Sequence, residues 1–323
     1  MTHSRLTLAL DDGALELPEG PVAVFGPPAG FDLSALARDR VTVVSRFFPD
    51  AEAWQRAGYE VVQSASGRFA AALVVLPRAK AAAKALIAEA AALAPLLLVD
   101  GQKHDGIDSI LKAVKARVTP LGVMSKAHGK LFWIEGGDFS DWAATDTEVD
   151  GFITRPGVFS ADGPDKGSRA LIEALPPLEG RVADLGAGWG YLARHVLMSE
   201  AVTRLDLIEA DATALDCARI NVSDPRATFQ WADANAFTPE TPYDVVVSNP
   251  PFHTGRSGAP ELGRAFIRAA AGMLTPSGQF WMVANRHLPY ETELSQHFHE
   301  IDEVGGTPGF KVIRASRPRR RRR

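Results

Sequence analysis

The first half of the chain alternates between short apolar runs and longer stretches that are rich in alanine or mix apolar with charged residues. Runs with many β-branched residues predict strands, and the longer stretches predict helices. The predicted strands are 6–10, 21–26, 41–44, 69–76 and 96–99, and the predicted helices are 32–39, 51–57 and 79–94. Strands that alternate with helices predict a parallel sheet covered by helices on both faces.

The second half repeats this alternation after a segment at 136–151 that is rich in glycine, aspartate, serine and threonine. An amphipathic helix at 169–175 comes first, and a second helix is predicted at 191–198. The predicted strands of this half are 181–185, 205–209, 228–231 and 245–248. We divide the chain into an α/β domain at 1–140, a linker at 141–152, a second α/β domain at 153–316 and an arginine-rich tail at 317–323, for which the composition predicts disorder.

Composition narrows the class of protein. The chain has 323 residues, is 46% hydrophobic and carries a net charge of −4, which is typical of a globular protein and gives no overall signal for nucleic-acid binding. Its one cysteine, Cys217, excludes an internal disulfide. A single cysteine also suits the reducing cytoplasm, where we expect the protein. Charged residues and a proline interrupt the apolar stretch at 81–99, so we expect no membrane span. His104 and His128 lack partners at metal-ligand spacing, and we expect no metal.

The residues best suited to bind a substrate follow the strand at 245–248. Asn249 comes next, and Pro250 and Pro251 have no N–H groups to continue a sheet. The Asn249 side-chain oxygen and the Pro250 carbonyl can each accept one N–H of a planar amino group, and Phe252 can stack on the ring that carries it. A plain Asn-Pro turn is the alternative, and the features upstream favour the amine-binding hypothesis.

A glycine-rich turn joins the predicted strand at 181–185 to the helix that follows it. Gly186, Gly188 and Gly190 let the backbone approach a ligand, and the helix start presents unpaired N–H groups. Dinucleotide-binding loops carry another glycine where Tyr191 stands here. Asp184 precedes the first glycine by two positions, which suits a cofactor with a cationic amino-acid tail better than one with a pyrophosphate.

Acidic residues also follow the next two predicted strands. Glu209 ends one strand about twenty residues after the glycine turn and could accept the hydroxyls of a ribose. Asp233, beside Ala234, follows the next strand and could hold an adenine amino group. Each acid alone could be a solvated loop carboxylate. The three at successive strand ends predict a nucleoside cofactor.

The first half lacks these features at the matching places. The turn at 26–30 contains prolines in place of ligand-facing amides, Ser45 stands where an acid would end a strand, and Leu76 stands where Asn249 stands. We interpret 1–140 as a degenerate copy of the second half. An unrelated α/β domain is the alternative.

Together these residues resemble the class I S-adenosylmethionine-dependent methyltransferases, and Asn-Pro-Pro-Phe resembles their amino-methylating branch. The whole second half is similar to the bacterial ribosomal RNA small subunit methyltransferase C family, and the first half to that family's degenerate leading domain, including Gly101 and Gly106. Seven motifs carry the resemblance: 156–160, Asp165-x-Gly-Ser168, 184–188, 248–253, 283–285, 288–290 and 310–314. Glu209 replaces the more usual aspartate, and the arginine tail extends beyond the family's end.

The resemblance implies two tandem Rossmann-like methyltransferase domains, the second catalytic, and N2-methylation of a guanine in 16S rRNA of the 30S subunit with S-adenosylmethionine. The expected catalytic residues are Asn249, Pro250, Pro251 and Phe252. The expected cofactor-binding residues are Phe159, Ser160, Asp184, Gly186, Ala187, Gly188, Gly190, Glu209, Asp233, Ala234 and Asn249. Their positions next to the Asn-Pro-Pro motif and on the helix after it make His253, Arg264 and Arg268 the expected RNA contacts; a structural role for His253 and simple solvation of the two arginines are the alternatives. We expect a monomer.

Other functions stay open at this point. Methylation of another amino nitrogen, such as a 23S rRNA guanine, adenine N6 or a protein glutamine, would use the same Asn-Pro-Pro motif. A noncatalytic RNA-binding assembly factor could keep the fold without needing Asp184, Glu209 and Asn249. A dehydrogenase fits the glycine turn least well.

Overall fold

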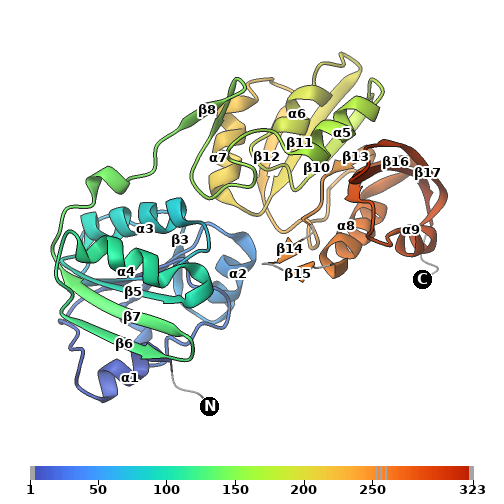
Figure 1. Ribbon diagram of the computed structural model, residues 1–323. Helices are drawn as coiled ribbons and strands as arrows, with labels where there is room; N and C mark the ends of the chain where they lie inside the picture. Colours follow the sequence, from blue (N-terminus) through green and yellow to red (C-terminus); the bar gives the residue numbers. More distant parts are fainter. Residues whose placement is uncertain (1–3, 252, 255–256, 259, 320–323) are drawn as a thin grey trace. The chain divides into compact units, whose positions relative to one another are not determined.

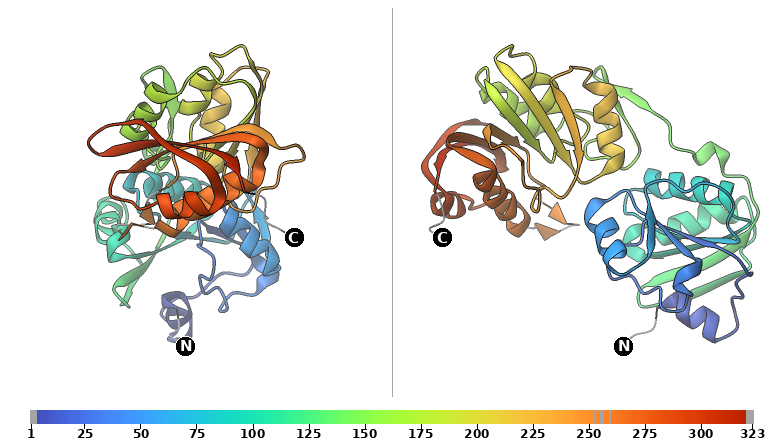
Figure 2. Two further views of the ribbon diagram at one scale, coloured as in Figure 1. Left: turned by 90° about the vertical axis from the view of Figure 1, so that its right-hand side faces the viewer. Right: turned by 180° about the vertical axis from the view of Figure 1, so that it is seen from behind.

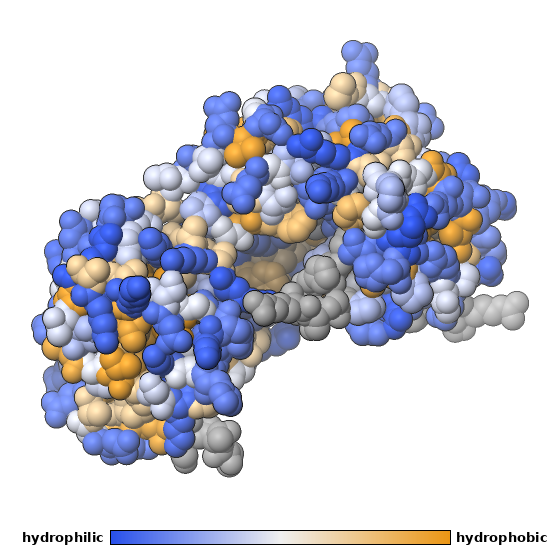
Figure 3. All heavy atoms as spheres, in the orientation of Figure 1, coloured by the Kyte–Doolittle hydropathy of each residue, from blue (hydrophilic) through white to orange (hydrophobic). Residues whose placement is uncertain are grey.

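The computed structural model describes residues 4–251, 253–254, 257–258 and 260–319 (Figure 1). It divides into two compact units, Met1–Asp146 and Thr147–Arg323. Within the described ranges no helix is long and apolar enough to cross a membrane. The face seen in Figure 3 is mostly hydrophilic, with apolar residues scattered between polar ones, as expected when most apolar side chains fill internal cores.

The first unit is a mostly parallel sheet between two layers of helices. Its strand order is β3-β2-β1-β4-β5-β7-β6, in which β7 is antiparallel to both β5 and β6. Residues of α3 and α4 fill the core on one face, and residues of α1 and α2 fill the core on the other. In chain order the elements, with η for a 3₁₀ helix, are α1 (Arg5–Asp11), β1 (Val22–Phe25), η1 (Arg38–Arg40), β2 (Val41–Val44), α2 (Phe48–Arg56), β3 (Glu60–Val62), β4 (Ala71–Val75), α3 (Lys80–Leu93), β5 (Leu96–Gln102), η2 (Lys103–Asp105), α4 (Ile107–Lys115), β6 (Gly122–Lys126), β7 (Gly129–Glu135) and η3 (Ser140–Trp142).

The second unit has the same architecture (Figure 2). Its main sheet has the order β12-β11-β10-β13-β16-β18-β17, with β18 antiparallel to β16 and β17. Helices α5, α6 and α7 pack on one face, and α8 and α9 pack on the other. The elements are β8 (Thr147–Val149), β9 (Phe152–Thr154), α5 (Lys166–Ala174), β10 (Gly180–Leu185), α6 (Tyr191–Val196), β11 (Val202–Glu209), α7 (Ala212–Asn221), β12 (Ala227–Trp231), β13 (Tyr243–Ser248), β14 (His253–Thr254), β15 (Ser257–Gly258), α8 (Pro260–Met273), β16 (Leu274–Asn285), α9 (Glu291–His297), β17 (Phe298–Gly306) and β18 (Phe310–Pro318).

The main sheets of the two units match strand for strand, which confirms the predicted tandem fold. The turns after β1 and β10 are anchored alike, because Gly26 N donates to Val44 O at 2.9 Å and Gly186 N donates to Ile208 O at 2.9 Å. The next residue after Val44 is Ser45, and the next after Ile208 is Glu209. The first unit therefore carries a hydroxyl where the second carries a carboxyl.

Two local predictions in the first unit are wrong. Residues 6–10 form part of helix α1, because Ser4 caps its start by accepting the N–H of Thr7 at 3.1 Å and Arg5 pairs with buried Asp100. Residues 32–39 form no α-helix and end in the short η1. There the Asp32 carboxyl accepts from the backbone and hydroxyl of Ser34, which favours a turn.

The predicted disordered tail begins too early. Strand β18 runs to Pro318, which pairs with Phe298, and Arg319 donates its backbone N–H to His297 O at 2.7 Å. Contacts with β17 and with the last residue of α9 therefore order the first three residues of the predicted segment. Residues 320–323 lie outside the described ranges.

Candidate functional site

The carboxyl ends of the central strands in the second unit lie side by side. Leu185 at the end of β10 is in register with Ile208 of β11 and with Ser248 at the end of β13. The Ser248 hydroxyl donates to Leu185 O at 2.7 Å and ties β13 to β10. The segments that follow these strands, which begin at Gly186, Glu209 and Asn249, therefore meet at one edge of the sheet.

The glycine turn adopts a backbone shape that other residues rarely accept. Gly186, Gly188 and Gly190 have φ angles of 71°, 56° and 90°. At Gly190 a β-carbon would stand 2.9 Å from Val222, so the turn is tight as well as left-handed. Helix α6 begins directly after it, and its free N–H groups lie at the same edge.

Glu209 holds this turn from the neighbouring strand. One carboxyl oxygen accepts the N–H of Gly188 and the other accepts the N–H of Asp211, both at 2.8 Å. Burial raises the pKa of this carboxyl, although the two backbone N–H groups act against the rise. Each oxygen keeps a second lone pair, which is the acceptor that a ribose hydroxyl needs.

Asp184 is completely buried behind the turn. Neither of its carboxyl oxygens has a hydrogen-bond partner among the residues that the structure describes. Burial raises the pKa of Asp184 to about 8, the charge of Glu209 adds to the rise, and the nearby backbone N–H of Ala193, which does not reach hydrogen-bond geometry, acts against it. A buried carboxyl without a partner is costly, and a cation brought to this edge would favour its ionised form. The carboxyl therefore fits a cofactor that carries positive charge.

Asn249 is held by its nitrogen. Its Nδ2 donates to Asp165 Oδ2 and to Ser168 Oγ, both at 2.9 Å. The same Asp165 oxygen caps α5 by accepting the N–H groups of Gly167 at 2.7 Å and Ser168 at 3.0 Å. Asn249 Oδ1 is buried and has no partner within the described part of the chain. The amide thus offers an acceptor and no donor to a ligand.

A pocket brings these parts together. Its lining residues are Phe159, Ser160, Asp165, Ser168, Gly186, Ala187, Gly188, Trp189, Tyr191, Leu192 and Asn249. Six of these are among the predicted cofactor residues: Phe159, Ser160, Gly186, Ala187, Gly188 and Asn249. The sequence-based prediction missed the other five. Asp165 carried a signal, because aspartate is a preferred N-cap residue at a helix start.

Five predicted cofactor residues lie outside this pocket lining. Glu209 holds the turn and Asp184 is buried next to it in the chain, as described, and Gly190 is the N-cap of α6. Asp233 is half-buried and accepts from the backbone and the side chain of Asn235, both at 2.9 Å, while Ala234 is buried in the core.

The residues predicted for catalysis and RNA contact differ in burial and in their partners. Pro250 is buried and Pro251 is exposed. Arg264 on α8 pairs with Glu261, and Arg268 pairs with Glu293 at 2.9 Å. Phe252 lies outside the described residues, as does the side chain of His253, whose backbone belongs to β14. Among the described residues no group of three histidine, cysteine or acidic side chains could hold a metal.

Comparison with known proteins gives consistent results. Residues 150–314 match the family model of the methyltransferase small domain. The ribosomal RNA small subunit methyltransferase C of Shewanella halifaxensis is 30% identical over 261 residues, which is 76% of each chain. The protein of the same name from Shewanella amazonensis is 29% identical over 265 residues, again 76% of each chain.

A solved structure covers both units. It is the T. thermophilus 16S rRNA N2 methyltransferase for guanine 1207 in complex with AdoMet and guanosine, and it is 25% identical with a TM-score of 0.80 over 98% of this chain and 92% of that one. The architecture, the strand-end site and these similarities agree. The chain belongs to the ribosomal RNA small subunit methyltransferase C family of class I S-adenosylmethionine-dependent methyltransferases.

Proposed function

We propose that this protein methylates the exocyclic N2 of a guanine in 16S rRNA of the small ribosomal subunit, with S-adenosylmethionine as the methyl donor. The observation that carries the proposal is Asn249 Oδ1, a buried acceptor without a described partner beside the glycine turn. The names of the relatives and the guanosine bound in the T. thermophilus enzyme support guanine as the base.

The cofactor is held by the edge of the second unit. The start of α6 provides backbone N–H groups, and the glycine turn lets the cofactor approach the backbone closely. Glu209 has lone pairs for the ribose hydroxyls, and Asp184 compensates positive charge. We assign the adenine amino group to Asp233 beside Ala234. When bound, S-adenosylmethionine supplies the methyl group: a bond forms between N2 and the methyl carbon as the carbon–sulfur bond breaks, and one amino proton is lost to water.

The residues after β13 prepare the amine. A guanine N2 amine is a poor nucleophile, because its lone pair is delocalised into the ring. Asn249 Oδ1 and the Pro250 carbonyl each accept one N–H, which localises the lone pair and stabilises the positive charge that grows on nitrogen. Pro251 stiffens the turn, and Phe252 stacks on the base. The base must leave its helix to enter the site.

RNA contacts on α8 would replace existing ion pairs. Arg264 and Arg268 lie four residues apart on one face; Arg264 pairs with exposed Glu261, and Arg268 pairs with Glu293, whose side chain is largely buried. An exposed ion pair contributes little to stability, so a phosphate with several acceptor oxygens can replace the Arg264 pair at small cost. We assign phosphate contacts to both arginines and a base or phosphate contact to His253.

The first unit positions RNA and carries out no chemistry itself. A pocket in this unit is lined by Lys103, Lys126, His128, Lys130, Ile107, Asp108, Ser125 and Gly129. The turn of the β6–β7 hairpin is tied to the segment after β5, because Lys103 N donates to His128 O at 2.9 Å. The Lys130 ammonium group pairs with the Asp108 carboxyl at 2.6 Å. The excess of positive charge suits the phosphates of RNA.

Replacing Lys103 and Lys126 together with alanine is expected to weaken binding of 16S rRNA about tenfold at low salt and to reduce the slope of log K against log salt by about 1 to 2. Methyl transfer at saturating RNA should be unchanged. The matched control is R56A/K115A, which removes two charges at the carboxyl ends of α2 and α4, at the opposite edge of the sheet. Equal losses in both variants would refute a local phosphate site.

The test of the proposed function is transfer of label from S-adenosylmethionine to 30S subunits, free 16S rRNA and 50S subunits, with nucleoside mass spectrometry of the product. We expect N2-methylguanosine in 16S rRNA at the position equivalent to guanine 1207. Label in 23S rRNA would move the assignment to the large subunit. No label in any RNA would refute an rRNA substrate and direct attention to protein or adenine amines.

Location and oligomeric state complete the proposal. An enzyme that acts on ribosomal RNA works where subunits assemble, and we place this one in the cytoplasm as a monomer. Light scattering should give a mass near 34.7 kDa. Twice that mass would refute the monomer.

A further inference from the structure

We infer that Asp165 is a positioning residue, assisted by Ser168, that fixes which end of the Asn249 amide faces the substrate. The inference rests on the proposed function, because it explains how the amide presents an acceptor to an amine. An asparagine amide has nearly the same shape after half a turn about its last torsion, yet the two orientations are chemically opposite. Something in the site must therefore select the orientation with Oδ1 toward the ligand.

The carboxyl of Asp165 makes that selection. Its Oδ2 can only accept hydrogen bonds, and it lies 2.9 Å from Asn249 Nδ2. A turned amide would place Oδ1 against Oδ2 with no proton between them, and it would point two N–H donors at an amine that also donates. The turned state loses a hydrogen bond on both sides, so it is disfavoured before any substrate binds.

Ser168 supports the selected orientation without imposing it. Its Oγ lies 2.9 Å from the same Asn249 nitrogen, and its side chain is buried. A hydroxyl can donate or accept, so it would tolerate either end of the amide. The choice of orientation thus depends on the carboxyl oxygen of Asp165.

The carboxyl is itself held from two sides. It caps α5 through Gly167 N and Ser168 N. Gly167 also lies against the ring of Phe310, since a β-carbon there would stand 3.1 Å from the ring and 2.9 Å from Asp165 Oδ2. Only a glycine leaves room for the ring and the carboxyl together.

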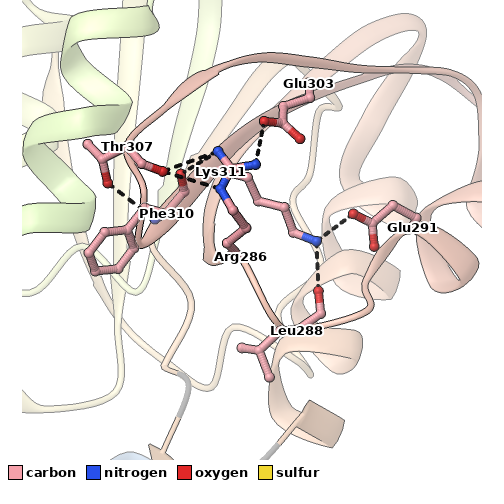
Figure 4. A network of polar contacts seen from close by, with 7 residues as sticks. All are labelled: Arg286, Leu288, Glu291, Glu303, Thr307, Phe310 and Lys311. Atoms are coloured by element: carbon pink, nitrogen blue, oxygen red, sulfur yellow. Dashed lines mark hydrogen bonds and ion pairs between the residues drawn. The ribbon is translucent and has the colours of Figure 1, made fainter.

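Phe310 begins β18, and a cationic network clamps the turn before it (Figure 4). Arg286 donates to Thr307 O at 3.2 Å and to Phe310 O at 3.0 Å, and it pairs with Glu303. Buried Lys311 donates to Leu288 O at 2.8 Å and pairs with Glu291. This network fixes the ring that backs α5, and α5 in turn fixes Asp165.

The decisive experiment replaces Asp165 in the wild-type protein and, separately, in the Asn249→Asp variant. Asp165→Ser keeps a good helix cap but supplies a shorter hydroxyl that cannot select one end of the amide. We expect it to lower kcat about 10- to 100-fold, with S-adenosylmethionine affinity within about threefold of wild type. Asp165→Asn keeps an oxygen at the capping position and should stay within about threefold of wild type in both quantities.

The second background is Asn249→Asp, in which both ends of residue 249 are oxygens and orientation no longer matters. In this background we expect Asp165→Ser to cost nothing in kcat, or to raise it by removing a repelling carboxyl. A purely structural role of Asp165 as a helix cap predicts the same loss in both backgrounds. That result, or wild-type kcat in the single Asp165→Ser variant, would overturn the inference.

Two further readouts separate this inference from the proposed function. With S-adenosylhomocysteine bound, the wild type should bind guanosine more tightly than inosine, which lacks the amine, and Asp165→Ser should lose this preference. A wild type without the preference would refute the guanine assignment.

The Asn249 side-chain N–H signals in NMR test the inference without any substrate: we expect slow exchange in wild type and Asp165→Asn, and fast exchange in Asp165→Ser. Slow exchange in all three would overturn it. If Asp165→Asn binds S-adenosylmethionine more weakly than wild type, the negative charge of Asp165 would instead serve cofactor binding, and the inference would be overturned.

Discussion

Replacing Asn249 with alanine is expected to lower the rate of methyl transfer about 10²- to 10³-fold, while S-adenosylmethionine binds within about threefold of its wild-type affinity. The substitution removes Oδ1, the acceptor that stabilises charge growing on the guanine nitrogen. The Pro250 carbonyl remains, so some activity should persist. Single-turnover rates on 30S subunits at saturating cofactor measure the loss, and calorimetry measures the affinity.

The matched control for this variant is Gln55→Ala, which removes an exposed amide from α2 in the first unit. It should leave the rate unchanged. A loss of less than about threefold in Asn249→Ala would contradict the assigned role. A loss that is restored by raising the cofactor concentration would show that Asn249 serves cofactor binding instead.

Replacing Asp184 with asparagine is expected to stabilise the cofactor-free protein at alkaline pH and to weaken S-adenosylmethionine binding about 30-fold or more. The carboxyl is fully buried with no described partner, so its charge is costly until a cation arrives. Asparagine has the same shape and stays neutral. One substitution should therefore raise stability and lower affinity.

The pH dependence has a definite sign. The pKa of Asp184 rises from 3.8 to about 8 on folding, chiefly because of burial. Between these values the folded protein holds a proton that the unfolded chain has released, so wild-type stability falls as the pH rises, by up to about 1.4 kcal/mol per pH unit. The Tm advantage of Asp184→Asn should be near zero at pH 4 and largest above pH 8.

Thermal unfolding from pH 4 to pH 9 tests this expectation, with Asp12→Asn at an exposed position as the control. Cofactor affinity of the wild type should rise with pH up to about 8, because binding favours the ionised carboxyl. A constant Tm difference between Asp184→Asn and wild type across this range would contradict a buried, protonated Asp184.

The sequence alone determined the fold class and the centre of the chemistry. Strand patterns in both halves have a local cause, because buried parallel strands need continuous apolar runs. The Asn-Pro-Pro motif and the glycine turn are also local, since proline and glycine restrict or permit particular backbone shapes wherever they occur. Parallel strands bring their carboxyl ends to one edge, so Gly186, Glu209 and Asn249 could be expected together before any coordinates were known.

Local patterns did not predict the secondary structure where the same residues could form either a strand or a helix. Leu6, Leu8 and Leu10 alternate with other residues as in a strand, yet they form α1. The helix depends on its cap at Ser4 and on the pair between Arg5 and Asp100, two residues that lie far apart in the chain. The tail beginning at Arg317 is comparable, because β17 supplies backbone partners that composition cannot reveal.

The orientation of the catalytic amide belongs to the tertiary structure alone. Asp165 and Asn249 are separated by 84 positions, and nothing periodic in the sequence relates them. The clamp of Arg286 and Lys311 behind Phe310 is likewise assembled from separate strands and loops. The sequence indicated part of the site, including the glycine turn and Asn249, but not Asp165 as a partner of that amide. Folding decided that the Asn249 nitrogen is held and its oxygen is offered, because a side-chain hydrogen bond depends on distance in space.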